Sequence, residues 1–213
     1  RSYKMIKNNK VELIGTYGSD ELIALAAWTS TSRELTDDKR ERIPKLINML
    51  ASEGHHTPFE RGILHFLLDV DDKTHIHLLK HRISSANGQS ARYREIKEDN
   101  ILIPSDLPLK WQEALIEHSD KGNELYHECL KSLVDDFGFS RKRAKEVSRY
   151  FKTQNCMITL DFQINFRSFI NFQRLRNSEH AQKEVMELSQ EMLKQVKEIN
   201  GNPFKHSLKA FGL

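Results

Sequence analysis

The chain has 213 residues, a length that fits one domain with a sizeable core over residues 1–213. Its 33 basic and 30 acidic residues are interspersed and leave a net charge of +3, which gives no reason to expect a nucleic-acid partner. Two distant cysteines support neither a disulfide framework nor a zinc knuckle, and no apolar run approaches the ~20 residues of a membrane span, so we expect a cytoplasmic protein without a membrane partner.

Hydrophobic periodicity in the N-terminal half predicts two strands and three helices. The strands are expected at 11–17 and 63–70, and the helices at about 20–27, 39–53 and 73–80. Ser19 or Asp20 would cap the first helix, and Asp71 or Asp72 would cap the third. The third helix leads into a loop at 82–90, after which residues 91–96 are expected to continue as a strand.

The C-terminal half is predicted to be mainly helical around one further strand. Pro104 and Pro108 mark an irregular connection, and Ser140 would cap a helix that runs to 149. Other helices are expected at 111–137, 166–175 and 178–198, and a strand at 156–164. Because helices and strands do not alternate as regular βαβ units, the order favours an α+β fold over a doubly wound sheet.

The stretch 80–93 gathers cations, hydroxyls and amides, and no Asp or Glu occurs from Thr74 to Arg94. Its small residues let backbone N–H groups approach a guest closely, and Arg82 and Arg92 can offer planar forks to phosphate oxygens. This pattern predicts a nucleotide-phosphate loop. A solvated basic turn between two elements explains the composition about equally well.

Three other groups of polar or charged residues fall on predicted helices. His77 and His81 would share a helix face as a zinc dyad, but no nearby carboxylate or thiol completes a ligand set, so we expect no metal. The basic cluster at 141–152 is typical of a solvated helix face. On the helix from 166, Arg167, Asn171 and Arg174 share one stripe while aromatic residues face a core.

Four blocks, in order along the chain, resemble the family of flavin-dependent thymidylate synthases. Lys80-His81-Arg82, seven residues and Ser90 resemble the family's signature of Arg-His-Arg, seven residues and Ser. Gly-His-His-Thr-Pro-Phe-Glu at 54–60 is similar to the family's upstream His-x-(Ser/Thr)-Pro-Phe-Glu segment. Asn-Phe-Arg-Ser at 165–168 and Leu-Arg-Asn-Ser-Glu-His-Ala-Gln at 175–182 resemble its two C-terminal blocks, and Arg149 resembles the Arg of the preceding helix.

The resemblance implies a thymidylate-synthase-complementing fold, in which helices flank a central, mostly antiparallel sheet. It also implies conversion of dUMP to dTMP with FAD, NADPH and methylenetetrahydrofolate, in a homotetramer whose sites draw on more than one subunit. Members of the family lack the cysteine nucleophile of the unrelated thymidylate synthase. Neither Cys129 nor Cys156 falls inside a matching block, which agrees with that absence.

The same resemblance implies one catalytic residue and two sets of binding residues. Arg176 would lie over the uracil, where its guanidinium favours the negative charge that develops on the ring. The nucleotide would be bound by Lys80, Gln89, Ser90, Arg92, Arg149 and Arg176. FAD would be bound by His55, Thr57, Lys80, His81, Arg82, Asn165, Arg167 and Asn171.

Four departures from the family's pattern leave the substrate open. Lys80 replaces a guanidinium fork by a point charge. His77 stands where the family commonly has Gln, Gly88 replaces an acid, and Trp28 ends a segment that reads Ala-Ala-Arg in the family. The alternatives are another pyrimidine deoxynucleotide, a hydroxymethyl product or, from a different class, a non-catalytic nucleotide or nucleic-acid binding module.

Overall fold

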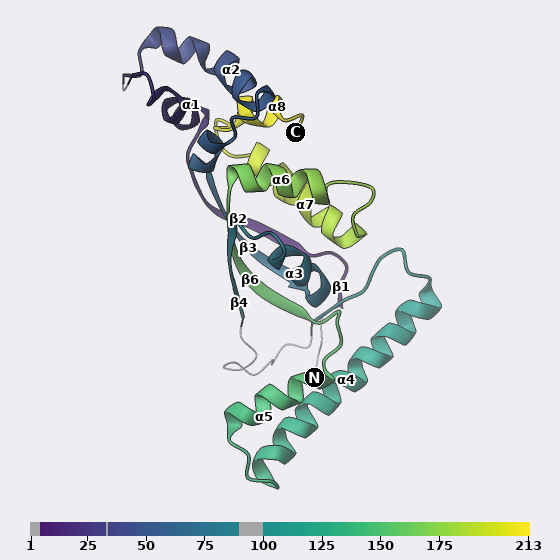
Figure 1. The fold of residues 1–213 in the computed structure, drawn as a ribbon. Coiled ribbons are helices and arrows are strands. Elements are labelled where there is room, and N and C mark those ends of the chain that lie inside the picture. Colours follow the sequence, from purple (N-terminus) through teal and green to yellow (C-terminus); the bar gives the residue numbers. More distant parts are fainter. Residues whose placement is uncertain (1–4, 33, 90–99) are drawn as a thin grey trace. The chain divides into compact units, whose positions relative to one another are not determined.

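The computed structural model describes residues 5–32, 34–89 and 100–213 (Figure 1). The chain forms two compact units, each made of three stretches of sequence. The first unit comprises Arg1–Lys10, Leu68–Leu79 and Asn87–Leu160, and the second comprises Val11–Leu67, Lys80–Ala86 and Asp161–Leu213. The sequence predicts a single domain over residues 1–213, and this stays a prediction.

A four-stranded antiparallel sheet has the strand order β2-β3-β6-β4. Its strands are β2 (Lys10–Tyr17), β3 (Ile63–Asp71), β6 (Met157–Asn165) and β4 (Ser84–Gly88). In β3, Leu64 and Phe66 are fully buried, whereas the alternate residue His65 is half-buried and bonds Asp161 of β6 across the strands, at 2.9 Å. This alternation is expected where one face of a sheet packs on a core. The observed mixture of sheet and helices confirms the predicted α+β class.

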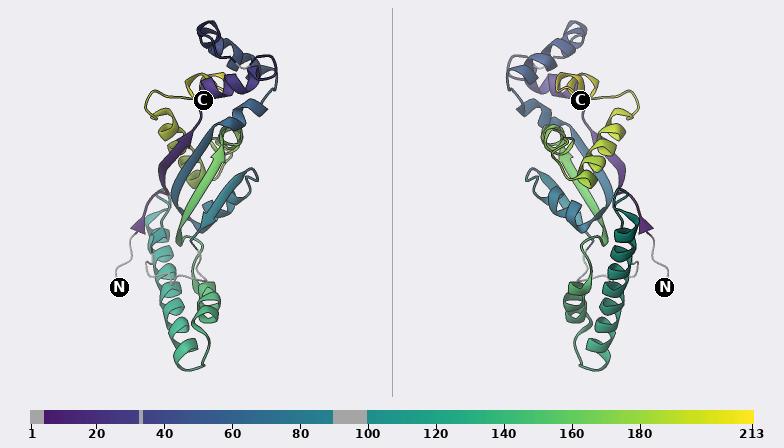
Figure 2. Two further views of the ribbon diagram at one scale, coloured as in Figure 1. Left: turned by 90° about the vertical axis from the view of Figure 1, so that its left-hand side faces the viewer. Right: turned by 90° about the vertical axis from the view of Figure 1, so that its right-hand side faces the viewer.

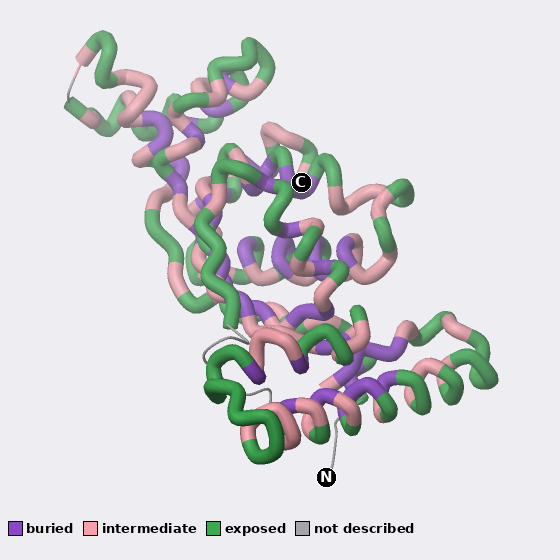
Figure 3. The backbone as a smooth tube through the Cα atoms, turned by 60° about the horizontal axis from the view of Figure 1, so that its bottom comes forward, coloured by how far each residue is buried: buried purple, intermediate pink, exposed green. Residues whose placement is uncertain are grey.

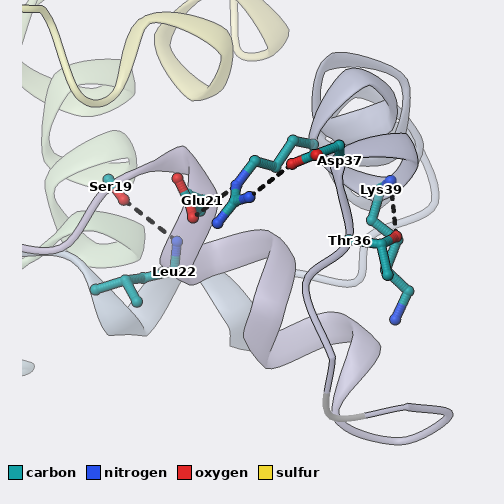
Figure 4. A network of polar contacts seen from close by, with 7 residues as sticks. Ser19, Glu21, Leu22, Thr36, Asp37 and Lys39 are labelled. Atoms are coloured by element: carbon teal, nitrogen blue, oxygen red, sulfur yellow. Dashed lines mark hydrogen bonds and ion pairs between the residues drawn. The ribbon is translucent and has the colours of Figure 1, made fainter.

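The second unit contains most of the helices. They are α1 (Asp20–Trp28), α2 (Asp37–Ser52), the 3-10 helix η1 (Thr57–Arg61), α6 (Phe166–Arg176), α7 (Lys183–Lys197) and α8 (Lys205–Ala210). Capping starts two of them as the sequence allows, because Ser19 Oγ accepts from Leu22 N and Thr36 Oγ1 accepts from Lys39 N (Figure 4). Phe169 of α6 stacks with Phe66 of β3, with ring centroids 6.3 Å apart, so this helix packs on the buried face of the sheet.

The first unit consists of a helical hairpin, a short helix and a minor sheet. Its elements are β1 (Met5–Ile6), α3 (Asp72–Leu79), β5 (Ile101–Leu102), α4 (Leu109–Asp135), α5 (Arg141–Ser148) and the 3-10 helix η2 (Arg149–Phe151). In both views of Figure 2, α4 and α5 run side by side. The buried positions of α4 recur along one side (Figure 3), and Tyr126 and Leu130 meet Ala144 of α5 there.

Two sequence-based expectations need correction, and one helix was missed. The predicted loop at 82–90 contains β4, because an edge strand needs only one partner, and even small, polar residues can pair with β6 there. The last long helix begins at Lys183 and not at 178, because Ser178 holds a local turn, its backbone oxygen accepting from Ala181 N. The helix α8 was not predicted, and the expected strand at 91–96 lies outside the described residues.

The other predicted elements are present, and their ends differ from the predicted ones by at most two residues. Asp71 caps α3, since its Oδ1 accepts from Lys73 N and Thr74 N. Within the described parts of the chain, no helix combines the length and the apolar character that crossing a membrane requires.

Candidate functional site

A cavity of about 490 Å³ lies in the second unit. Its walls are the segment between α3 and β4, the exposed side of α6, one residue before η1 and one residue after α8. The lining residues are His56, Lys80, His81, Arg82, Ile83, Arg167, Ser168, Ile170, Asn171, Arg174, Leu175, Arg176 and Phe211. Two blocks that are far apart in the sequence therefore meet in one wall.

The segment 80–83 is anchored by one buried side chain. His81 is only 8% exposed, and its ring meets Phe172 of α6 edge-on, with centroids 4.9 Å apart. Lys80 and Arg82 on either side are exposed. Burial of His81 thus fixes the backbone from which two cations reach the cavity.

The helix α6 divides into an apolar side and a polar side, as its sequence predicts. Asn165 caps it, since Asn165 Oδ1 accepts from Ser168 N at 2.8 Å. Phe166, Phe169, Ile170 and Phe172 are buried, while Arg167, Asn171 and Arg174 are exposed and line the cavity. Arg167 is held by Glu60 of η1, with Nη1 and Oε1 2.7 Å apart. The 3.6-residue period therefore presents the polar stripe to the cavity.

Arg176 and His81 form a directional contact inside the site. Arg176 Nε lies 3.2 Å from His81 Nε2, and the guanidinium can only donate. His81 Nε2 must then accept, which requires a neutral ring with its proton on Nδ1. A neutral His81 thus orients Arg176, the residue for which the family resemblance implies a catalytic role.

The electrostatic character of the cavity is strongly positive. Among the described residues that line it, five carry a guanidinium or an ammonium group and none is an acid. These are Lys80, Arg82, Arg167, Arg174 and Arg176. An anion, above all a phosphate that can accept from several planar forks, is the guest that fits this donor set. The volume falls within the ~300 to 1,000 Å³ of ordinary ligand sites.

The structure brings together six of the predicted site residues. Lining the cavity are Lys80, His81, Arg82, Arg167, Asn171 and Arg176. His55, Thr57 and Asn165 belong to the same unit but do not line it, whereas Gln89 and Arg149 belong to the first unit. Ser90 and Arg92 lie outside the described residues. The functional roles of all of these residues stay predictions.

Sequence reasoning missed part of the wall. The lining residues that were not predicted are His56, Ile83, Ser168, Ile170, Leu175 and Phe211. The sequence places Arg174 on the polar stripe of α6 but does not predict it as a site residue. The helical period could have indicated Ser168, Ile170 and Leu175, because they share α6 with Arg167. Nothing in the sequence connects Phe211 with position 56.

Neither cysteine lines the cavity: Cys129 is half-buried in α4 and Cys156 is buried directly before β6. Among the residues that the structure describes, no three or more His, Cys, Asp or Glu side chains come close enough to hold a metal ion.

Comparisons with known proteins give one consistent result. The family described as thymidylate synthase complementing protein matches residues 12–200. A flavin-dependent thymidylate synthase of Clostridium tetani is 30% identical over 93% of this chain and 86% of its own length. One from Pseudothermotoga lettingae is 32% identical over 84% of this chain and 80% of its own length.

A solved structure has the same fold. It is the UMP/dUMP methylase PolB from Streptomyces cacaoi bound with 5-Br dUMP, with a TM-score of 0.79 and 24% sequence identity. The match covers 98% of this chain and 97% of the other. This likeness confirms the predicted fold.

Proposed function

Because this chain belongs to the thymidylate synthase complementing protein family, we propose that it is a flavin-dependent thymidylate synthase that methylates dUMP to dTMP. The observation that carries the proposal is the cavity itself. It joins the signature segment 80–83 to the polar side of α6 and surrounds the space with five cations. Both substrate and cofactor of such an enzyme are phosphate esters, which this donor set suits.

The cavity residues fit a flavin dinucleotide. A pyrophosphate needs several converging donors, and Arg82 of the segment 80–83 and Arg167 of α6 offer planar forks while Lys80 adds an ammonium group. His81 and Asn171 complete the set that would hold FAD. Bound there, the flavin supplies the redox chemistry, with NADPH as reductant and methylenetetrahydrofolate as carbon donor.

Arg176 acts on the pyrimidine in this proposal. Its Nε is engaged by His81, so the two terminal nitrogens of the guanidinium remain available to a uracil carbonyl and N3. A cation fixed at that edge favours negative charge on the ring, which makes carbon 5 nucleophilic. Because His81 holds the guanidinium in advance, little reorganisation accompanies the reaction.

A complete site in this proposal draws on a homotetramer. His55 and Thr57 are exposed and do not line the cavity of their own chain, so they are available to a neighbouring subunit. Gln89, Ser90, Arg92 and Arg149 bind the nucleotide in the same proposal. The proposal also includes a cytoplasmic location for the protein.

The test is product analysis with purified protein, dUMP, methylenetetrahydrofolate and NADPH. We expect a yellow protein, NADPH oxidation that dUMP stimulates, and dTMP as the product identified by mass spectrometry. A hydroxymethyl product, or turnover of another pyrimidine deoxynucleotide only, would overturn the assignment to dTMP synthesis. A colourless protein with salt-dependent oligonucleotide binding would overturn the enzyme assignment altogether.

A further inference from the structure

One end of the cavity is aromatic. The rings of His56, Phe59 and Phe211 meet edge to face, with centroid distances of 5.2 Å for His56–Phe211 and 5.0 Å for Phe59–Phe211. Phe59 is fully buried, whereas His56 and Phe211 line the cavity. The pair therefore presents a wall whose back is filled by Phe59. Phe211 lies beyond residues 12–200, the part of the chain that the family matches.

Phe211 is held in this wall by the anchoring of α8. Asp20 is 6% exposed, and its carboxylate accepts from His206 N at 2.6 Å, from Ser207 N at 3.0 Å and from Ser207 Oγ. These bonds satisfy donors at the beginning of α8 in the manner of a capping residue supplied from α1. Phe204, just before the helix, stacks on Phe166 with centroids 4.5 Å apart. Both contacts fix where the C-terminal residues lie.

The cavity has two chemically different ends, and α6 runs from one end to the other. Arg167 in its first turn is paired with Glu60 of η1, the 3-10 helix that follows His56. Arg176 is the last residue of the same helix. Nine helical steps separate the two residues, which is about 14 Å of axis. The aromatic wall thus belongs to the Arg167 end, and Arg176 with His81 forms the other.

We propose that His56 and Phe211 form the wall that takes the adenine ring of the flavin dinucleotide. This inference rests on the proposed function. There, Arg176 engages the pyrimidine, and the flavin ring must lie against the pyrimidine to react with it. The second ring of the dinucleotide then lies at the far end, beyond the cations that hold the pyrophosphate. An extended dinucleotide carries a planar ring at each end of its phosphates, and the aromatic wall offers stacking surface for the one that Arg176 does not engage.

His56 adds a polar group to the same wall. Its Nε2 lies 3.2 Å from the backbone oxygen of Ala51, so that nitrogen carries the proton and Nδ1 of the neutral ring is an acceptor. An exocyclic amino group, which adenine has, matches an acceptor. The wall thus favours an aminated ring over an unsubstituted one.

The experiment compares FAD with FMN, which lacks the adenosine half. Flavin is removed from the purified protein, and the apoprotein is titrated with each flavin while its fluorescence is followed. We expect Phe211→Ala to weaken FAD binding about 5- to 150-fold, the range for loss of one stacked base. FMN binding should stay unchanged, and Phe211→Tyr should retain FAD binding.

A matched control and a positioning variant complete the design. Phe137→Ala removes an exposed ring that does not line the cavity and should change neither affinity. Asp20→Asn should weaken FAD binding but not FMN binding, because Asp20 acts only through the placement of Phe211. Circular dichroism and thermal melting of each apoprotein report whether the variant is folded.

Each outcome either supports or overturns the assignment of the adenine ring to this wall. Equal losses of FAD and FMN affinity in Phe211→Ala would show that the wall contacts the flavin half, and unchanged affinity for both would show that it contacts neither ring; either result overturns the inference and leaves the proposed function standing. Wild-type apoprotein that binds neither flavin would overturn both.

Discussion

Removing the acceptor at position 81 should release Arg176 from its aligned position. The variant His81→Leu keeps an apolar group against Phe172 but offers nothing to Arg176 Nε, which now lies 3.2 Å from His81 Nε2. A hydrogen bond to a charged group contributes about 1.5–3 kcal/mol. We therefore expect kcat/KM for dUMP to fall about 10- to 150-fold, with most of the loss in kcat.

The conservative variant separates orientation from packing. His81→Gln returns a side-chain oxygen near the position of Nε2 and should recover most of the activity. In the background Arg176→Ala and with FAD saturating, replacing His81 should cost little more, since the partner of its Nε2 is already gone. A His81→Leu enzyme within about twofold of wild-type kcat/KM would refute the argument that His81 orients Arg176.

Protonation of His81 should lower the activity in the same way as the substitution His81→Leu. The imidazolium has two donors and no acceptor, so it could no longer accept the hydrogen bond from Arg176 Nε. Activity should therefore fall as the pH is lowered, and in His81→Gln this acid limb should be absent. Identical pH profiles for both proteins would contradict the link.

Three further predictions concern stability and are checked by thermal or urea unfolding. Gly122→Ala should destabilise by about 1–3 kcal/mol, because the added Cβ would lie 2.6 Å from the backbone oxygen of Phe151; an unchanged melting temperature would contradict this close approach. Phe162→Ala, at a fully buried position of β6, should cost about 3–5 kcal/mol, and a loss below about 1 kcal/mol would contradict its place in the core. Burial lowers the pKa of His75 below its ordinary value of 6.5, against the opposing charge of Asp72. As the pH falls, His75 therefore takes up a proton in the unfolded chain before it does so in the folded protein. Its contribution to the free energy of unfolding is complete above about pH 6.5 and is lost as the pH falls through the lowered pKa. His75→Gln should flatten the dependence of the free energy of unfolding on pH in this range, and an unchanged dependence would contradict the prediction.

Local chemistry made most of the fold predictable. Ser19 and Ser140 each precede a helix in the sequence, and each side chain accepts from the backbone N–H three residues on. The strand β6 is recognisable from its alternation of apolar and polar residues. What failed was β4, whose sequence Ser-Ser-Ala-Asn-Gly has no strand propensity and which forms only because β6 offers an edge.

The candidate site was predictable where one element carried the pattern. Arg167, Asn171 and Arg174 fall on one side of α6 by helical period alone, and the structure lines the cavity with all three. The pairing of Arg176 with His81 joins residues 95 positions apart, and no local pattern encodes it. Phe211 needed the anchoring of α8 by Asp20, a contact across 187 positions from Asp20 to Ser207. Long-range packing decided each of these placements.

The same geometry explains how the site can activate a pyrimidine without sulfur. Attack by a thiolate requires a cysteine in the cavity wall, and Cys129 and Cys156 both lie outside it, one half-buried and one buried. In the proposed function, the reactivity of carbon 5 then comes from charge placed against the ring. There, the guanidinium of Arg176 provides such a charge, and the buried imidazole of His81 holds it in advance, because its orientation is already fixed by folding. The cost of this arrangement is repulsion within a cluster of five cations, which the Glu60–Arg167 ion pair offsets in part. An anionic cofactor would offset the remainder, so binding of that cofactor should also stabilise the second unit.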